Sequence, residues 1–229
     1  MPLPLILAHR GDWSRADENS LDAFAAALRR PGVDGVEFDV RGAGDGTPVV
    51  IHDATLGRLR GVRRRVRDLS VGQLRELGVR TLAEIVHALP APFFLDIELK
   101  EDIGARVIPV IIASRGDPPL DVAVSSFDAA TIKDITGAHP DWRCWLISRR
   151  LDSTVIAEAI AAGCCGIAAR WPALARPGRR LAGEAGLELA TWTIEDPAVL
   201  DRVTDIGLAA ICVDPPALPA TSRANPSRD

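Results

Sequence analysis

The chain has 229 residues, with 27 basic and 31 acidic side chains and a formal net charge of −4 at pH 7. This acidic balance argues against a surface that binds the phosphate backbone of nucleic acid, because such surfaces are usually strongly basic. No apolar run reaches the roughly 18 residues of a membrane-spanning helix, and the segment before His9 is too short for a signal peptide. We therefore expect a cytoplasmic protein that does not bind nucleic acid.

Short apolar or β-branched runs alternate with amphipathic stretches along the whole chain. The predicted strands are, in chain order, Leu5–Ala8, Gly35–Val40, Phe93–Leu99, Val122–Ser125, Arg143–Ile147, Cys165–Ala168, Leu187–Thr193 and Ala209–Val213. The predicted helices are Leu21–Arg30, Leu82–Leu89, Ala105–Ser114, Ala129–Gly137, Ser153–Ala162, Ala173–Ala185 and Ala198–Thr204. This alternation favours parallel strands, and eight strands are the number that closes a (β/α)₈ barrel. Counting alone leaves a doubly wound sheet open.

Two segments depart from the alternation. A further short strand is predicted at Pro48–Ile51, where it would form a hairpin with the second strand after the turn Gly44-Asp45-Gly46. The last part of the chain is rich in Pro, Ser, Ala and Arg and has no periodicity, which predicts a tail. We therefore expect one domain over residues 1–215 and a flexible tail over 216–229.

Acidic residues interrupt two of the predicted strands. Glu37 and Asp39 are two positions apart, so their side chains lie on the same face of a strand, and Glu98 stands at the same level of the third predicted strand. Three carboxylates at one end of a barrel would repel unless a cation neutralises them, and oxygen ligands suit Mg²⁺ or Ca²⁺. The alternative is that Glu37 and Asp39 form ordinary ion pairs with nearby arginines.

Two histidines come directly after strands. His9 follows the first predicted strand, and His52 follows the predicted hairpin strand. Because histidine titrates near neutral pH, one ring could take a proton from the nucleophile while the other gives one to the leaving oxygen. A single histidine at a strand end is more often structural, but two that flank a carboxylate cluster favour catalysis.

Arg10 and Lys100 place positive charge beside the acids. A phosphate group needs such charges on its non-bridging oxygens. Only Lys100 and Lys133 are lysines in a chain that otherwise uses arginine, so a lysine inside the acidic motif is informative. Lys100 could instead be a solvated residue at a strand end.

The order of these motifs resembles the glycerophosphodiester phosphodiesterase family. The matching residues are His-Arg-Gly at 9–11, Glu-Asn at 18–19, Gly-Val-Glu-Phe-Asp-Val at 35–40, Val-Val-Ile-His-Asp at 49–53, Thr-Leu-Ala-Glu at 81–84, Glu-Leu-Lys at 98–100, Ser-Ser-Phe at 125–127, Thr-Trp-Thr at 191–193 and Val-Asp-Pro at 213–215. Each fragment alone is weak, but the ordered series covers nearly the whole chain.

The resemblance implies a single-domain (β/α)₈ barrel that uses a divalent cation to hydrolyse glycerophosphodiesters to glycerol 3-phosphate and an alcohol. It implies that Glu37, Asp39 and Glu98 are the metal ligands and that His9 and His52 are the general acid and base. Arg10 and Lys100 would then bind the phosphate, and Trp192 would form a wall of the substrate pocket. The segment after His52-Asp53 is compact, so a capping insertion after the second strand must be short.

Other functions remain open from the residues alone. A related enzyme of the lysophospholipase D type would use the same metal centre but needs an apolar groove for an acyl chain. A catalytically silent barrel that acts as a binding protein is a second alternative, although no predicted site residue is missing. A sugar-phosphate isomerase on this fold is not supported by the two histidines. The alcohol part of the substrate, the choice between Mg²⁺ and Ca²⁺ and the oligomeric state stay undetermined.

Two further features have mainly structural interpretations. The arginine-rich run Arg58–Arg67 could contact an anionic membrane surface, but a solvated loop is the favoured interpretation. Cys144, Cys164, Cys165 and Cys212 lack metal-finger spacing and are predicted to be small buried residues without disulfides.

Overall fold

Eight parallel strands form a closed barrel in the computed structural model, which describes residues 3–221. The strands are β1 (Leu5–His9), β2 (Gly35–Gly42), β4 (Phe94–Leu99), β5 (Val122–Ser126), β6 (Cys144–Ser148), β7 (Gly166–Arg170), β8 (Glu188–Ile194) and β9 (Ala210–Val213). Each pairs with the next, and β1 closes the ring because it pairs with both β9 and β2. The predicted barrel is confirmed, and the doubly wound alternative is excluded.

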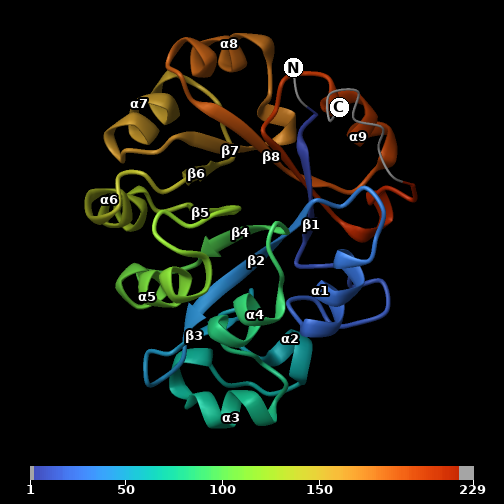
Figure 1. The fold of residues 1–229 in the computed structure, drawn as a ribbon, viewed down its shortest axis with the longest axis vertical. Helices are drawn as coiled ribbons and strands as arrows, with labels where there is room; N and C mark the ends of the chain where they lie inside the picture. Colours follow the sequence, from blue (N-terminus) through green and yellow to red (C-terminus); the bar gives the residue numbers. More distant parts are fainter. Residues whose placement is uncertain (1–2, 222–229) are drawn as a thin grey trace.

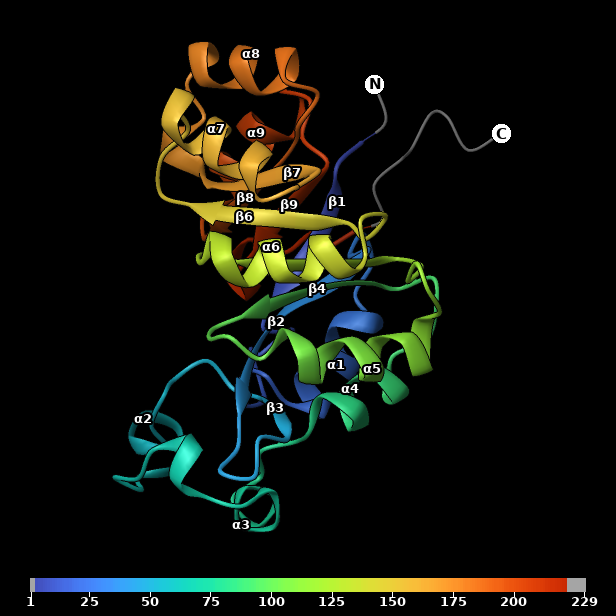
Figure 2. The ribbon, with the colours of Figure 1, turned by 90° about the vertical axis from the view of Figure 1, so that its left-hand side faces the viewer.

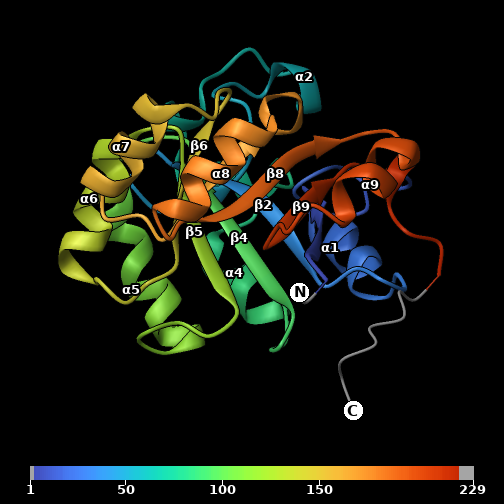
Figure 3. The same ribbon diagram turned by 90° about the horizontal axis from the view of Figure 1, so that it is seen from above.

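Helices cover the outside of the barrel (Figures 1 and 3). The main ones are α1 (Leu21–Leu28), α4 (Leu82–Ala88), α5 (Gly104–Arg115), α6 (Ala129–Ala138), α7 (Ser153–Ala161), α8 (Arg176–Glu184) and α9 (Pro197–Thr204). Several begin at a side chain that caps the first turn. At α4, Thr81 accepts from the backbone N–H of Glu84, and the Glu84 carboxylate accepts from the N–H of Thr81. In the part of the chain that the structure describes, no helix is long and apolar enough to span a membrane.

The connection from β2 to α4 contains a small insertion. Strand β3 (Pro48–Val50) runs antiparallel to β2, and the short helices α2 (Gly57–Arg60) and α3 (Val71–Glu76) follow, with a 3-10 turn, η1 (Val66–Asp68), between them. The insertion has its own apolar cluster, which includes Leu56, Leu69 and Leu74. Figure 2 shows α2 and α3 beyond β3, away from the helices around the barrel. The predicted short insertion after strand two is confirmed.

The barrel has two apolar layers. The larger one lies between the strands and the helices. The inner layer includes Phe94 and Trp145, whose rings stack with their centroids 6.1 Å apart, and the small residues Ala168, Ala190 and Ala210. These three alanines also line a cavity inside the barrel, because their methyl groups leave space that larger side chains would fill.

Some expectations need correction. The helix predicted at Ala173–Ala185 is a 3-10 turn, η2 (Trp171–Ala173), followed by α8, which begins only at Arg176 because Pro177 fits the first turn of a helix. Cys165 is exposed, whereas the other three cysteines are buried as predicted and all four are free.

The packed part of the barrel domain extends beyond residue 215. A last 3-10 turn, η3 (Pro215–Ala217), leads to Leu218, which is buried in the larger apolar layer. Arg30 donates hydrogen bonds to the carbonyl oxygens of Leu218 and Pro219. Most of the predicted tail, residues 222–229, lies outside the described residues.

Candidate active site

A cavity of about 460 Å³ opens where the carboxyl ends of the strands meet. Functional sites of (β/α)₈ barrels lie at this end. The predicted site residues that line the cavity are His9, Arg10, Glu37, His52, Glu98, Lys100 and Trp192. Asp39, the remaining predicted residue, is fully buried and pairs in register with Glu98. The structure therefore brings the whole predicted set together.

The three predicted metal ligands form a compact carboxylate cluster. One oxygen from each of Glu37, Asp39 and Glu98 lies within 4.8 Å of the other two. Glu37 Oε1 and Asp39 Oδ1 are buried and accept no hydrogen bond, although Asp39 Oδ1 lies 3.3 Å from Lys100 Nζ. A buried carboxylate oxygen without a donor is costly. A hard divalent cation would satisfy these oxygens, so the donor set fits Mg²⁺ or Ca²⁺.

The carboxylates of this cluster differ in pKa. Burial, together with repulsion from Asp39 and Glu98, raises the pKa of Glu37 well above its usual value. Burial and Asp39 likewise raise the pKa of Glu98. Burial would also raise the pKa of Asp39, but Arg10 and Lys100 outweigh it and lower that pKa. A bound divalent ion would oppose the raised pKa values of Glu37 and Glu98, because it stabilises the charged carboxylates.

Arg10 and Lys100 supply the positive charge next to the acids. Arg10 Nε lies 3.2 Å from Asp39 Oδ2, and Lys100 Nζ lies 2.6 Å from Glu98 Oε1. The predicted alternative of an acid–arginine ion pair thus occurs at Asp39. Lys100 is held between two carboxylates, so it is not a freely solvated lysine.

The loop after β1 turns sharply to aim Arg10 at the acids. Arg10 has φ = 58° and Gly11 has φ = 85°, both in the left-handed region. A side chain at Gly11 would clash with the backbone of Ala23, 2.8 Å from its Cβ, so only glycine fits there. The backbone N–H of Arg10 donates to the carbonyl oxygen of Glu37, which fixes the loop on β2. The local strain therefore serves to position Arg10.

Each histidine has a carboxylate partner on one ring nitrogen. His9 Nδ1 lies 2.6 Å from Asp214 Oδ1, and His52 Nδ1 lies 2.7 Å from Asp53 Oδ1. His9 Nε2 lies 3.7 Å from Glu37 Oε2, so it faces the carboxylate cluster. Burial lowers the pKa of His52, although Asp39 and Asp53 oppose this effect. A carboxylate on Nδ1 fixes the tautomer and leaves Nε2 for proton transfer.

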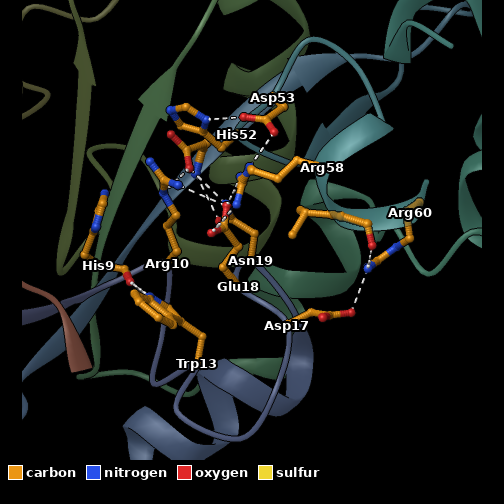
Figure 4. A network of polar contacts seen from close by, with 12 residues as sticks. His9, Arg10, Trp13, Asp17, Glu18, Asn19, His52, Asp53, Arg58 and Arg60 are labelled. Carbon is orange, nitrogen blue, oxygen red and sulfur yellow. Dashed lines mark hydrogen bonds and ion pairs between the residues drawn. The ribbon is translucent and has the colours of Figure 1, made fainter. Parts of the chain in front are cut away.

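An ion-pair network connects the site to the short helix α2 (Figure 4). Arg58 donates to both oxygens of Glu18 and, through Nε, to Asp53 Oδ2 at 2.7 Å. Glu18 also accepts from Arg10. The hydrogen bonds from Arg58 and His52 lower the pKa of Asp53 to about 2, although partial burial opposes them. Arg58 therefore supports both Arg10 and the carboxylate that holds His52.

The arginine-rich run of the insertion divides into two groups. Arg58 and Arg60 point toward the body of the protein, where Arg60 pairs with Asp17 (Figure 4). Arg63, Arg64, Arg65 and Arg67 are exposed. The alternative that this run contacts an anionic membrane surface is untested and would rest on these four side chains.

A further acid lies inside the barrel beside the cluster. Asp96 is opposite Glu37 in register and accepts a hydrogen bond from Ser125 Oγ at 2.6 Å. Burial raises the pKa of Asp96 to about 7, because the bond from Ser125 does not compensate for the loss of hydration and the nearby charges of Glu98 and Asp39. Asp96 is therefore a mainly protonated acid at mildly acidic pH.

The other side of the cavity is aromatic and cationic. Phe127 and Trp192 meet edge to face with ring centroids 5.5 Å apart, and Phe127 is 41% exposed. Trp192 Nε1 donates to the carbonyl oxygen of Ala168, so the indole is fixed against β7. Arg149 and Arg170 complete this wall.

Several residues that the structure places in the site had no predicted role. Asp214 and Glu18 belong to matched motifs, and Asn19 donates to Asp39 Oδ2 at 2.9 Å. The matched motifs that contain these three residues are the sequence signal that could have identified them. Arg149 and Arg170 gave no signal at all, because arginine is so common in this chain that one arginine carries little information.

Comparisons with known proteins agree with this geometry. The model of the glycerophosphoryl diester phosphodiesterase family matches residues 9–218. A glycerophosphodiester phosphodiesterase from Caldanaerobacter subterraneus subsp. tengcongensis is 25% identical over 93% of this chain and 94% of its own length.

Solved structures with the same fold include members of that group. The glycerophosphodiester phosphodiesterase from Agrobacterium tumefaciens is 25% identical, with a TM-score of 0.80 over 93% of this chain and 97% of its own. A phosphodiesterase from Oleispira antarctica, solved with the product sn-glycerol-3-phosphate, has a TM-score of 0.83 at 24% identity over 94% of each chain.

Proposed function

The chain belongs to the glycerophosphoryl diester phosphodiesterase family and is a phosphodiesterase, and from that premise we propose how its residues hydrolyse a glycerophosphodiester to glycerol 3-phosphate and an alcohol. The observation that carries the proposal is the pair of orphaned carboxylate oxygens, Glu37 Oε1 and Asp39 Oδ1, beside two histidines that each have a carboxylate partner. This arrangement combines a cation site with two proton-transfer groups.

Glu37, Asp39 and Glu98 would hold a divalent cation, Mg²⁺ or Ca²⁺. When bound, this ion stabilises negative charge on the phosphoryl oxygens. Arg10 and Lys100 bind the same group from the protein side, since both lie next to the cluster and carry N–H donors. Together these charges bind the phosphodiester more tightly as negative charge develops on it.

His9 and His52 transfer the protons. One ring takes a proton from the attacking hydroxyl, which belongs to water or to the substrate's own glycerol. The other ring gives a proton to the oxygen of the leaving alcohol as the phosphorus–oxygen bond breaks. Attack by water gives glycerol 3-phosphate directly, whereas attack by the glycerol hydroxyl gives a cyclic phosphate, which water then opens to glycerol 3-phosphate. The lowered pKa of His52, caused mainly by burial, supports His52 as the base, because the neutral ring is the form that accepts a proton. His9 then acts as the acid, with Asp214 stabilising its protonated ring.

A coupled assay for glycerol 3-phosphate tests the proposal. Glycerophosphocholine, glycerophosphoethanolamine, glycerophosphoglycerol and glycerophosphoinositol are each supplied with and without EDTA. We expect release of glycerol 3-phosphate from at least one diester and its loss in EDTA, with recovery on addition of Mg²⁺ or Ca²⁺. Activity that EDTA leaves unchanged would refute the cation site.

A choline-release assay run beside it separates the two alternatives. A lysophospholipase D would release choline from lysophosphatidylcholine faster than from glycerophosphocholine. A silent barrel would release nothing from any diester. The presence of all the predicted site residues around one cavity supports the active enzyme over the silent barrel.

A further inference from the structure

We propose that Arg149 and Arg170 form a second anion-binding subsite, and that the preferred substrates are glycerophosphodiesters with another negatively charged group besides the diester phosphate. The inference rests on the proposed function, because the subsite is a part of the same cavity. The subsite lies on the side of the cavity formed by β6, β7 and β8. The predicted metal ligands come from other strands, β2 and β4.

The strand register places the two arginines next to each other. Arg170 is the last residue of β7, and Arg149 comes directly after Ser148, the last residue of β6. Ser148 pairs with Ala169, so the positions that follow on both strands are neighbours at the carboxyl end. Both side chains line the cavity.

The aromatic pair lies beside these arginines. Arg170 pairs in register with Trp192, and the Arg149 guanidinium carbon lies 5.2 Å from the centre of the Phe127 ring. Lys100 Nζ lies 5.9 Å from the same ring. The proposed phosphate-binding lysine and Arg149 therefore contact one common side chain, so a single small molecule can reach both.

Neither guanidinium has a polar partner among the described residues. Within residues 3–221, no carboxylate forms an ion pair with Arg149 or Arg170, and no acceptor receives a hydrogen bond from either side chain. The adjacent Arg150 differs, because its Nε lies 3.6 Å from Asp152. The five N–H donors of each cavity arginine are therefore free for a ligand.

The charges around the cavity explain why these donors select an anion. Among the described residues, the carboxylates that line it are Glu37, Asp96 and Glu98, which all come from β2 and β4. On the opposite side, two positive charges without acids repel a cationic alcohol such as choline. A phosphate monoester or a carboxylate would bind there through forked hydrogen bonds from arginine.

A matched pair of substrates tests the inference. Glycerophosphoinositol 4-phosphate and glycerophosphoinositol differ by one phosphate monoester, and glycerophosphocholine supplies a cationic alcohol. We expect kcat/KM of the wild type to be about 10- to 100-fold higher for the phosphorylated diester than for glycerophosphoinositol. Glycerophosphocholine should be the poorest of the three.

Variants test whether the two cavity arginines cause this substrate preference. In the double variant Arg149→Ala/Arg170→Ala, the preference should fall to within about twofold of unity, mainly through a higher KM for the phosphorylated diester. Arg150→Ala is the matched control, because it removes a neighbouring exposed arginine that does not line the cavity. It should keep the wild-type preference. Both arginines are exposed, so the double variant is expected to fold.

A binding measurement separates this inference from the proposed function. Calorimetry in EDTA compares the Kd values of the two inositol diesters without turnover. Tighter binding of the phosphorylated diester by the wild type, lost in the double variant, supports the subsite even when no diester is hydrolysed. Equal Kd values and equal kcat/KM for the two diesters would overturn the subsite and leave the phosphodiesterase proposal intact.

Discussion

The two halves of the cavity rim balance their charges in different ways. On the half formed by β1, β2 and β4, the charged side chains are paired with one another. Arg58 pairs with Glu18 and Glu18 with Arg10 (Figure 4), and Arg10 in turn pairs with Asp39. On the half formed by β5 to β8, Arg149 and Arg170 have no carboxylate partner in the described structure.

Burial accounts for the difference. Asp39 is fully buried and Glu37 is 4% exposed, so each needs compensating charge from the protein or from a cation. Arg149 and Arg170 are exposed, where water solvates an unpaired guanidinium at little cost. The first half is therefore organised for chemistry before the substrate arrives, and the second half keeps its charges available for binding.

The largest effect is expected from breaking the cation site of the first half. Glu37→Gln or Asp39→Asn removes a ligand charge, so kcat/KM should fall by roughly 10³- to 10⁵-fold, the loss expected when several kcal/mol of charge stabilisation disappear. Calorimetry with Mg²⁺ or Ca²⁺ should show weaker binding. Glu195→Gln, an exposed acid directly after β8, is the control and should change neither quantity. Full activity in Asp39→Asn would show that the cluster is not the cation site.

The second-largest loss of activity is expected when either proton-transfer histidine is removed. His9→Ala and His52→Ala should each lower kcat by roughly 10²- to 10⁴-fold while the circular dichroism spectrum is unchanged. His87→Ala on the exposed side of α4 is the matched control. Unchanged turnover in either site variant would remove that histidine from the mechanism.

Removing the ion pairs that Arg58 of the insertion forms should lower activity by a smaller factor. Arg58→Ala leaves Asp53 and Glu18 without their shared partner, so activity should fall by about 10- to 100-fold, a range typical of residues that orient a ligand or catalytic group. Arg58→Lys should recover part of the loss. Arg63→Ala removes an exposed arginine of the same insertion and should have no effect. Equal losses in Arg58→Ala and Arg63→Ala would indicate a general effect of charge.

A separate effect concerns stability and its dependence on pH, and it does not act on catalysis. Asp96 has a pKa of about 7 when folded and about 3.9 when unfolded, so the folded state retains its proton longer. The free energy of unfolding should therefore fall as pH rises from 4 to 7, by at most about 4 kcal/mol, and then level off. Urea unfolding in EDTA should show this slope in the wild type and a smaller slope in Asp96→Asn, because the raised pKa values of Glu37 and Glu98 contribute with the same sign.

Asp53 provides a contribution of the opposite sign. Its folded pKa is lowered to about 2, so its stabilising effect is complete above about pH 4 and is lost as pH falls toward 2. Asp53→Asn should weaken the acid sensitivity of the protein between pH 4 and 2. An unchanged slope in that range would contradict the role of Arg58 in holding Asp53.

The sequence by itself determined the order of strands and helices and the positions of the acids, histidines and Lys100. These features depend on local periodicity and on residues that end a strand, and both are properties of a short stretch of chain. The chain order of Glu37, Asp39 and Glu98 was enough to predict one carboxylate cluster, because neighbouring parallel strands have a regular register.

Only the tertiary structure decided which charges are paired. Arg58 meets Glu18 across 40 positions of the chain, and His9 meets Asp214 across 205. Arg149 and Arg150 are adjacent and identical in type, yet within residues 3–221 only Arg150 has an acidic partner. Ion pairing depends on which side chains the closed barrel brings within a few ångströms, and the sequence pattern does not carry that distance.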